Sequence, residues 1–166
     1  MNVLTRTLKT AWEEVNQPFN LAGGDDFRSY VREVLFPQKD YEPVDKTISY
    51  MGEGEGPQDW TGLPDFKFFS KVSGLEFFVE AKFRSHFQDQ ILEWCKFFQL
   101  KRYQELDNLA PVLIAIGVGG RASAPERLFL LPVKHIKFVK LYPGFMQKYE
   151  LHPGPVSAGH LKRILE

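Results

Sequence analysis

Residues 64–83 of the sequence, PDFKFFSKVSGLEFFVEAKF, decide the fold. Phe66 to Lys71 and Leu75 to Phe83 are two runs of aromatic and β-branched residues, and a short polar segment with Ser73 and Gly74 separates them. Two such runs with a glycine-containing turn between them are typical of a β-hairpin. We therefore predict two antiparallel strands joined by a two-residue turn.

The second strand of this hairpin carries charge on one of its faces. Side chains alternate between the faces of a strand, so one face of residues 75–83 is wholly apolar while the other carries Glu80 and Lys82. A two-residue turn would set Asp65 opposite Lys82 and diagonal to Glu80, on the same face. A three-residue turn would move Asp65 to the other face. The site therefore depends on the hairpin register.

Convergence of Asp65, Glu80 and Lys82 would create a site with specific chemistry. Neighbouring carboxylates repel each other and are stabilised by protonation, a cationic side chain or a bound cation. Hard carboxylate oxygens suit Mg²⁺ or Mn²⁺, which keep several waters and share their coordination with substrate phosphates. A lysine beside them would orient a water or stabilise charge at phosphorus. This predicts phosphodiester hydrolysis, with a surface ion-pair cluster as the alternative.

Hydrophobic periodicity places the remaining elements around the hairpin. The predicted order is helix, helix, three strands, helix, two strands and short helices, which indicates an α/β domain with a mixed β-sheet flanked by α-helices. The predicted ranges are helices over 3–15 and from about 25 to 36, a strand over 41–50, a loop over 51–63, a helix over 87–106, strands over 111–116 and 128–133, and short helices over 135–141 and 145–151.

Length and composition restrict the class of protein. At 166 residues the chain has the size of one domain, so we predict a single domain over residues 1–166. Cys95 is the only cysteine, which excludes an intrachain disulfide and a cysteine-based zinc cluster. The absence of a signal-peptide pattern and of a long apolar run predicts a cytoplasmic protein without a membrane span.

The charge distribution is asymmetric although the formal net charge is zero. Residues 121–166 hold eight Lys or Arg against three Glu, so the first part of the chain is acidic and the last part basic. This distribution suits an enzyme that concentrates carboxylates around a metal and holds phosphates elsewhere. The alternative is an ordinary solvated basic face.

The motif resembles that of the PD-(D/E)XK nuclease superfamily, the restriction-endonuclease-like enzymes that include Holliday junction resolvases and RecB-type exonucleases. The matching residues are Pro64-Asp65 and, after an interval, Glu80-Ala81-Lys82. The resemblance implies a Mg²⁺- or Mn²⁺-dependent DNA endonuclease. In it Asp65 and Glu80 bind the metal, the Ala81 carbonyl assists, and Lys82 activates the attacking water.

Further matches extend the resemblance over roughly residues 24 to 133. The order of helix, hairpin, helix and further strands is that of the family. Gln99 and Tyr103 match a Gln-x-x-x-Tyr feature of RecB-like members, and at i and i+4 they share one helix face. The resemblance makes Gln99 a positioning group at the site. The alternatives are a surface glutamine and a packing aromatic.

One departure from the family lies in the helix that follows Gly24. Active relatives often place a glutamate a few residues after this glycine as a further metal ligand, and here that position holds Arg28. Asp25, Asp26 or Glu33 would have to substitute, and we rank Asp25 first, although each also suits a helix cap or a solvated charge. If none fits, the chain would be a catalytically inactive nucleic-acid-binding module of the same fold.

The resemblance also implies DNA as the partner, and a homodimer as one assembly that cuts both strands. Residues suited to nucleic-acid contacts lie at the end of the motif strand and on the following predicted helix: Arg84, His86, Lys96, Lys101, Arg102 and Tyr103. Mixed with acidic neighbours, the basic residues equally suit ordinary surface pairs.

Overall fold

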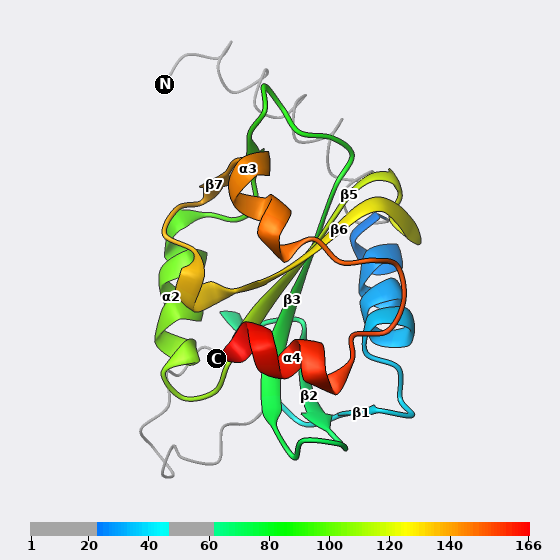
Figure 1. The fold of residues 1–166 in the computed structure, drawn as a ribbon. Helices are drawn as coiled ribbons and strands as arrows, with labels where there is room; N and C mark the ends of the chain where they lie inside the picture. Colours follow the sequence, from blue (N-terminus) through cyan, green and yellow to red (C-terminus); the bar gives the residue numbers. More distant parts are fainter. Residues whose placement is uncertain (1–22, 47–61) are drawn as a thin grey trace, which may run out of the picture.

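A computed structural model describes residues 23–46 and 62–166. Within these ranges, one sheet contains the strands β1 (Tyr41–Pro43), β2 (Phe66–Ser70), β3 (Glu76–Arg84), β5 (Val112–Arg121) and β6 (Ala124–Pro132), in the order β1-β2-β3-β5-β6 (Figure 1). Strands β3 and β5 are parallel, and the other neighbours are antiparallel. The sheet is therefore mixed, as predicted.

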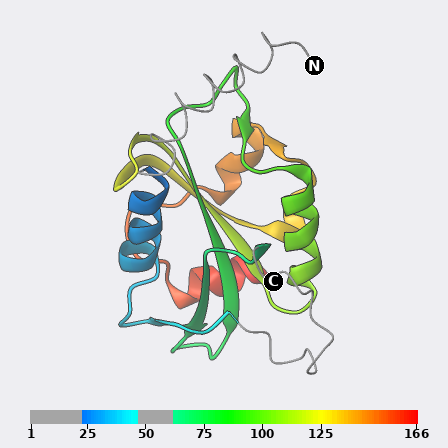
Figure 2. The same ribbon diagram turned by 180° about the vertical axis from the view of Figure 1, so that it is seen from behind.

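Helices flank both faces of this sheet. Residues 23–30 are α-helical and continue into the π-helix η1 (Val31–Leu35), which lies across the sheet from α2 (Phe97–Asp107) in both views (Figures 1 and 2). The remaining described elements are β4 (Leu92–Glu93), η3 (Val133–His135), β7 (Lys140–Leu141), α3 (Pro143–Met146), η4 (Gln147–Tyr149) and α4 (Ala158–Leu165). None of the described helices is long and apolar enough to cross a membrane.

Two hydrophobic clusters hold the layers together, one on each face of the sheet. On the face of the first helix, Phe27 is fully buried above Gly117 of β5, and a Cβ atom on Gly117 would lie 2.6 Å from the Phe27 ring. This glycine allows helix 23–30 to approach the sheet closely. The close approach brings Arg28, the next residue, to the edge of the motif hairpin.

The hairpin register differs from the prediction by two residues. Phe66 pairs with Val79 and Phe69 with Glu76, so Asp65 falls opposite Glu80 rather than Lys82. The predicted two-residue turn is wrong because residues 71–75 all belong to the connection, which the Ser70 N–H closes by donating to the Leu75 carbonyl at 2.8 Å. An even shift keeps every side chain on its predicted face.

The helix predicted over residues 87–106 begins only at Phe97. Before it, Asp89 and Gln90 adopt positive φ angles of 50° and 61° in a tight turn, and this left-handed backbone is incompatible with a helix. Strand β4 then pairs with β7, more than forty residues further along the chain. Pairing with a distant strand replaced the helix that the local pattern predicted.

Other predicted elements were partly wrong or lie outside the described residues. Strand β5 continues through Gly119 and Gly120, whose φ angles are 75° and 66°, so its turn comes later than predicted. Residues 140–141, predicted as helix, form β7. The C-terminal helix α4 was not predicted. Of the strand predicted over 41–50 only Tyr41–Pro43 is a strand among the described residues. The predicted helix 3–15 and most of the predicted loop lie outside them.

Candidate active site

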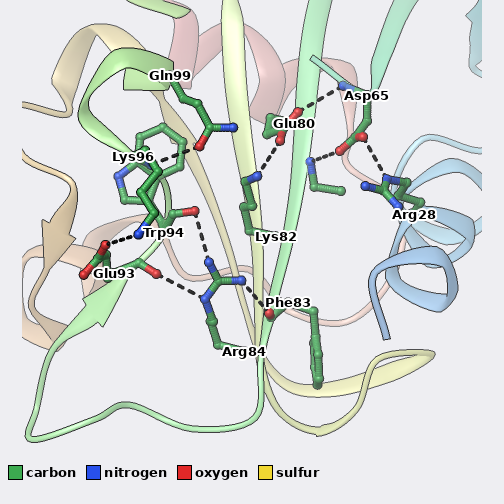
Figure 3. A network of polar contacts seen from close by, with 11 residues as sticks. Arg28, Asp65, Glu80, Lys82, Phe83, Arg84, Glu93, Trp94, Lys96 and Gln99 are labelled. Atoms are coloured by element: carbon green, nitrogen blue, oxygen red, sulfur yellow. Dashed lines mark hydrogen bonds and ion pairs between the residues drawn. The ribbon is translucent and has the colours of Figure 1, made fainter. Parts of the chain in front are cut away.

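Asp65 and Glu80 face each other where strand β2 begins (Figure 3). The Asp65 N–H donates to Glu80 Oε2 at 3.1 Å, and the Ala81 N–H donates to Asp65 Oδ2 at 2.9 Å. Each carboxylate therefore accepts a backbone N–H beside the other carboxylate. Glu80 lies within strand β3, and Asp65, which directly precedes β2, is tied to β3 through the Ala81 N–H.

Two cationic side chains complete this cluster. Lys82 Nζ lies 2.7 Å from Glu80 Oε1, and Arg28 Nε lies 2.7 Å from Asp65 Oδ1. With the backbone donors, all four carboxylate oxygens have a partner within the chain. The cluster pairs two negative with two positive side chains. We call Arg28, Asp65, Glu80 and Lys82 the carboxylate cluster.

Glu80 is the most deeply buried member of the carboxylate cluster, with 7% of its side chain exposed. Burial raises the pKa of Glu80 above its ordinary value, and the adjacent Lys82 ammonium lowers it in part. Hydrogen bonding by the Tyr103 hydroxyl is a further, smaller cause that lowers the pKa of Glu80, and burial raises the pKa of Tyr103. Tyr103 therefore supports Glu80 from α2 as a protonated donor.

Tyr103 and Gln99 occupy the face of α2 that was predicted to point to the site. Tyr103 is buried and stacks on Trp94, with 6.2 Å between the ring centroids. It therefore approaches Glu80 from the interior of the domain and not from the surface. Gln99 Oε1 accepts from the Lys96 N–H at 3.0 Å and caps the start of α2. In the view of Figure 3 the Gln99 carboxamide extends toward Lys82 and Glu80. Of these two residues, Tyr103 is the one that interacts with the carboxylate cluster, through Glu80.

Asp25, the acid that we ranked first as a further metal ligand, lies on the far side of Arg28. Its Oδ1 atom is 2.9 Å from Arg28 Nη1, and 80% of its side chain is exposed. Arg28 therefore bridges Asp25 and Asp65. In the part of the chain that the structure describes, no group of three or more His, Cys, Asp or Glu residues is arranged to hold a metal ion.

The donor set that remains still fits a magnesium-type ion in its chemistry. The N–H and C=O groups of one strand residue lie on the same edge of the strand, so the Ala81 carbonyl shares the edge on which its N–H meets Asp65. Two carboxylates and this carbonyl are hard oxygen donors. Mg²⁺ is commonly held by one or two carboxylates, with waters and substrate phosphates in its other positions.

The residues predicted to contact nucleic acid divide into two groups. Arg84 is part-buried, and it donates to the carbonyls of Glu93 and Trp94 at 3.1 and 3.2 Å, which ties down the segment before α2. Burial lowers the pKa of Arg84. Four others are exposed at the surface: His86, Lys96, Lys101 and Arg102. Of these, Lys96 pairs with Glu93 at 3.4 Å.

Sequence patterns missed two parts of this site. The Arg28–Asp65 pair joins residues 37 positions apart, and only the unexpected base after Gly24 marked that region. Trp94 supports Tyr103 from a segment that was predicted to be helical. Both contacts join segments that are far apart in the sequence, and local periodicity carries no information about how such segments pack together.

Comparison with known proteins identifies a fold. No protein-family model and no curated protein matches the chain. The solved structure of Hjc, a Holliday junction resolvase from the archaeal hyperthermophile Archaeoglobus fulgidus, is similar with a TM-score of 0.51 and 12% sequence identity, over 83% of this chain and 97% of that one. At this identity the likeness shows the fold alone. The chain has the predicted fold class, a mixed sheet with flanking helices like that of a resolvase.

Proposed function

We propose that this protein is a metal-dependent DNA endonuclease, in which Asp65 and Glu80 hold Mg²⁺ or Mn²⁺ and Lys82 assists the attacking water. One observation carries the proposal: the Lys82 ammonium lies 2.7 Å from Glu80 Oε1, and backbone N–H donors link Glu80 and Asp65 across the motif hairpin at 3.1 and 2.9 Å. Glu80 is buried there although burial opposes its charge, and perturbed acids of this kind cluster at functional sites. The resolvase-like fold supports the same reading.

The metal, when bound, would polarise the phosphoryl oxygen and lower the pKa of a bound water. The chain's own residues would do the rest. An ammonium group has three donors, so Lys82 can keep its bond to Glu80 while it orients a water or a phosphate oxygen. Tyr103 fixes the Glu80 carboxylate from behind. Gln99 would position substrate through its amide nitrogen, because its oxygen caps α2.

Arg28 would pair with Asp65 in the free protein and with a phosphate of the substrate in the complex. Its guanidinium is partly exposed beside Asp65, and guanidinium binds phosphate in a bidentate manner. If a cation bound at Asp65 weakened the pairing between Arg28 and Asp65, the Arg28 guanidinium could pair with a DNA phosphate instead. Arg28 would then hold the strand next to the scissile bond.

A second candidate function is a catalytically inactive DNA-binding module, and a specific observation favours it. Arg28 sits 2.7 Å from Asp65 and already supplies positive charge where a metal would. If this pair is permanent, the cluster is a structural ion-pair network. The two candidates differ in one measurable property, which is cleavage.

Cleavage is tested with labelled duplex, single-stranded and four-way-junction DNA in Mg²⁺ and in Mn²⁺. The wild type is compared with Asp65→Asn and Lys82→Met, and with matched exposed controls Glu105→Gln and Lys162→Met. We expect the two site variants to lose cleavage, the controls to retain it, and circular dichroism to show the same fold throughout. Cleavage that survives both site substitutions would sink the nuclease proposal. DNA binding without cleavage by the wild type in either metal would favour the inactive module.

A further inference from the structure

A hollow on the molecule, separate from the carboxylate cluster, is both basic and aromatic. It lies between η3 and η4, has a volume of about 660 Å³, and is flanked by a smaller hollow of about 390 Å³. The side chains that matter are Lys137, Phe138, Lys140, Tyr142, Phe145 and Lys148. We call these six residues the basic aromatic surface. Its volume lies in the range of roughly 300–1,000 Å³ that is usual for small-molecule and cofactor sites.

The positive charge of this surface has no partner within the described residues. The sequence from Lys134 to Tyr149 contains no Asp or Glu. The surface has three lysines, and none of them takes part in an ion pair within residues 23–46 and 62–166: Lys137, Lys140 and Lys148. Like-charged side chains gathered without counterions create a local potential that attracts anions. The surface therefore suits a negatively charged ligand.

The aromatic side chains here are unusually exposed. Phe138 is 70% and Tyr142 57% exposed, and Phe97 at the start of α2, which lines the smaller hollow, is 65% exposed. Lys148 Nζ lies 5.1 Å from the ring centroids of both Phe145 and Tyr149, so cations and ring faces are interleaved. Exposed apolar surface gathered in one place marks an interaction site.

Interleaved lysines and exposed rings match the chemistry of unpaired nucleotides. Each unpaired base offers a flat face that stacks on an aromatic ring, while each phosphate pairs with a lysine. A duplex offers no free base face, because its bases are stacked on one another. A purely acidic peptide would use the lysines and leave the rings exposed to water. Single-stranded nucleic acid uses both groups.

The basic aromatic surface is connected to the carboxylate cluster through Trp94. The Trp94 indole N–H donates to the Phe138 carbonyl at 3.2 Å, and β4 pairs with β7, which contains Lys140. Trp94 also stacks on Tyr103, the hydrogen-bond donor to Glu80. Figure 1 shows β7 and α3 beside the start of α2, on the α2 side of the sheet. The surface therefore has a fixed position relative to the cluster.

We propose that the basic aromatic surface binds single-stranded nucleic acid, with bases stacked on Phe138 and Tyr142 and phosphates on Lys137, Lys140 and Lys148. The identification of this ligand as a substrate rests on the proposed nuclease function. The substrate would then be DNA with an unpaired segment. Binding itself requires no cleavage.

The test is fluorescence anisotropy of a labelled oligothymidylate with the full chain, at several salt concentrations and without divalent metal. We expect Phe138→Leu and Tyr142→Leu each to weaken binding by about 5- to 150-fold, because each removes one stacking platform. Tyr142→Phe keeps the ring and should bind as the wild type does. Phe98→Leu is the matched control, since Phe98 is 65% exposed but lines neither hollow.

A lysine variant tests the phosphate contacts independently. Lys140→Gln should reduce the slope of log affinity against log salt by about one unit, whereas Lys162→Gln should not change it. Unchanged affinity in both leucine variants, with melting curves that show them folded, would overturn the proposal. Equal competition by polyglutamate or by anionic lipid vesicles would overturn it as well, because it would indicate a general anion site.

The outcomes separate this proposal from the nuclease proposal. Asp65→Asn should bind oligothymidylate as the wild type does, because the carboxylate cluster is not part of the basic aromatic surface. Loss of cleavage in Asp65→Asn with binding unchanged supports both proposals. Cleavage by a wild type that shows no single-strand binding would refute the surface and leave the nuclease intact. Single-strand binding without any cleavage would refute the nuclease proposal and support the binding surface.

Discussion

Replacing Arg28 with alanine should tighten the binding of a divalent cation to the carboxylate cluster. Arg28 Nε lies 2.7 Å from Asp65 Oδ1, so an ion bound to that carboxylate would lie one metal–oxygen bond of about 2.1 Å further on, at about 5 Å from the guanidinium. Arg28 is partly exposed, with 43% of its side chain accessible, so water screens the repulsion. With the dielectric constant of water, a charge of two and a charge of one at about 5 Å repel by about 1.7 kcal/mol.

A repulsion of this size corresponds to a change of about 15- to 20-fold in affinity. The assay is a titration with Mn²⁺ in which electron paramagnetic resonance counts the free ion. Arg28→Ala should bind Mn²⁺ more tightly than the wild type by about this factor. Arg32→Ala is the matched control, because Arg32 lies one turn later on the same helix and pairs only with Glu33 in the described structure. Equal or weaker binding by folded Arg28→Ala would show that Arg28 does not oppose a cation there, and would refute the reasoning.

Three further predictions concern pH, packing and the hydrogen bond to Glu80. Burial raises the pKa of Glu80 in the folded chain above 4.5. The wild type should therefore lose stability relative to Glu80→Gln as the pH rises above about 4.5, which urea melts at several pH values measure. A stability difference that is independent of pH would contradict this prediction. Gly117→Ala should lower the free energy of unfolding by about 1–3 kcal/mol, because its Cβ would lie 2.6 Å from the Phe27 ring; an unchanged melting curve would refute the close packing. Tyr103→Phe should cost about 1 kcal/mol of stability and reduce cleavage by the proposed enzyme, and full retention of both would deny the hydrogen bond a role.

The hairpin was predictable because its pattern is local and has a period of two. The turn was placed wrongly, yet Asp65 stayed on the face of Glu80, since a shift of two residues preserves the alternation. Apolar runs likewise indicated β5 and β6, although their ends were wrong. Alternation and apolar runs are properties of neighbouring residues, so sequence alone contains them.

Contacts between distant segments were not predictable. The long helix was predicted because residues 87–96 are compatible with helical periodicity, but pairing of Leu92 with Leu141 and the left-handed turn at Asp89 determine that segment instead. The contact of Arg28 with Asp65 follows from the close approach of Phe27 to Gly117. Neither pairing leaves a periodic signal in the sequence.

The central claim is that Asp65 and Glu80 form a metal site, and calorimetric titration of Mn²⁺ into the wild type and into Asp65→Ala tests it most directly. Glu105→Ala serves as the control, because Glu105 is an exposed acid on α2 that lies outside the cluster. The account predicts one bound Mn²⁺ per chain in the wild type and in Glu105→Ala, and none in Asp65→Ala. Absence of binding to all three, or equal binding to all three, would contradict it.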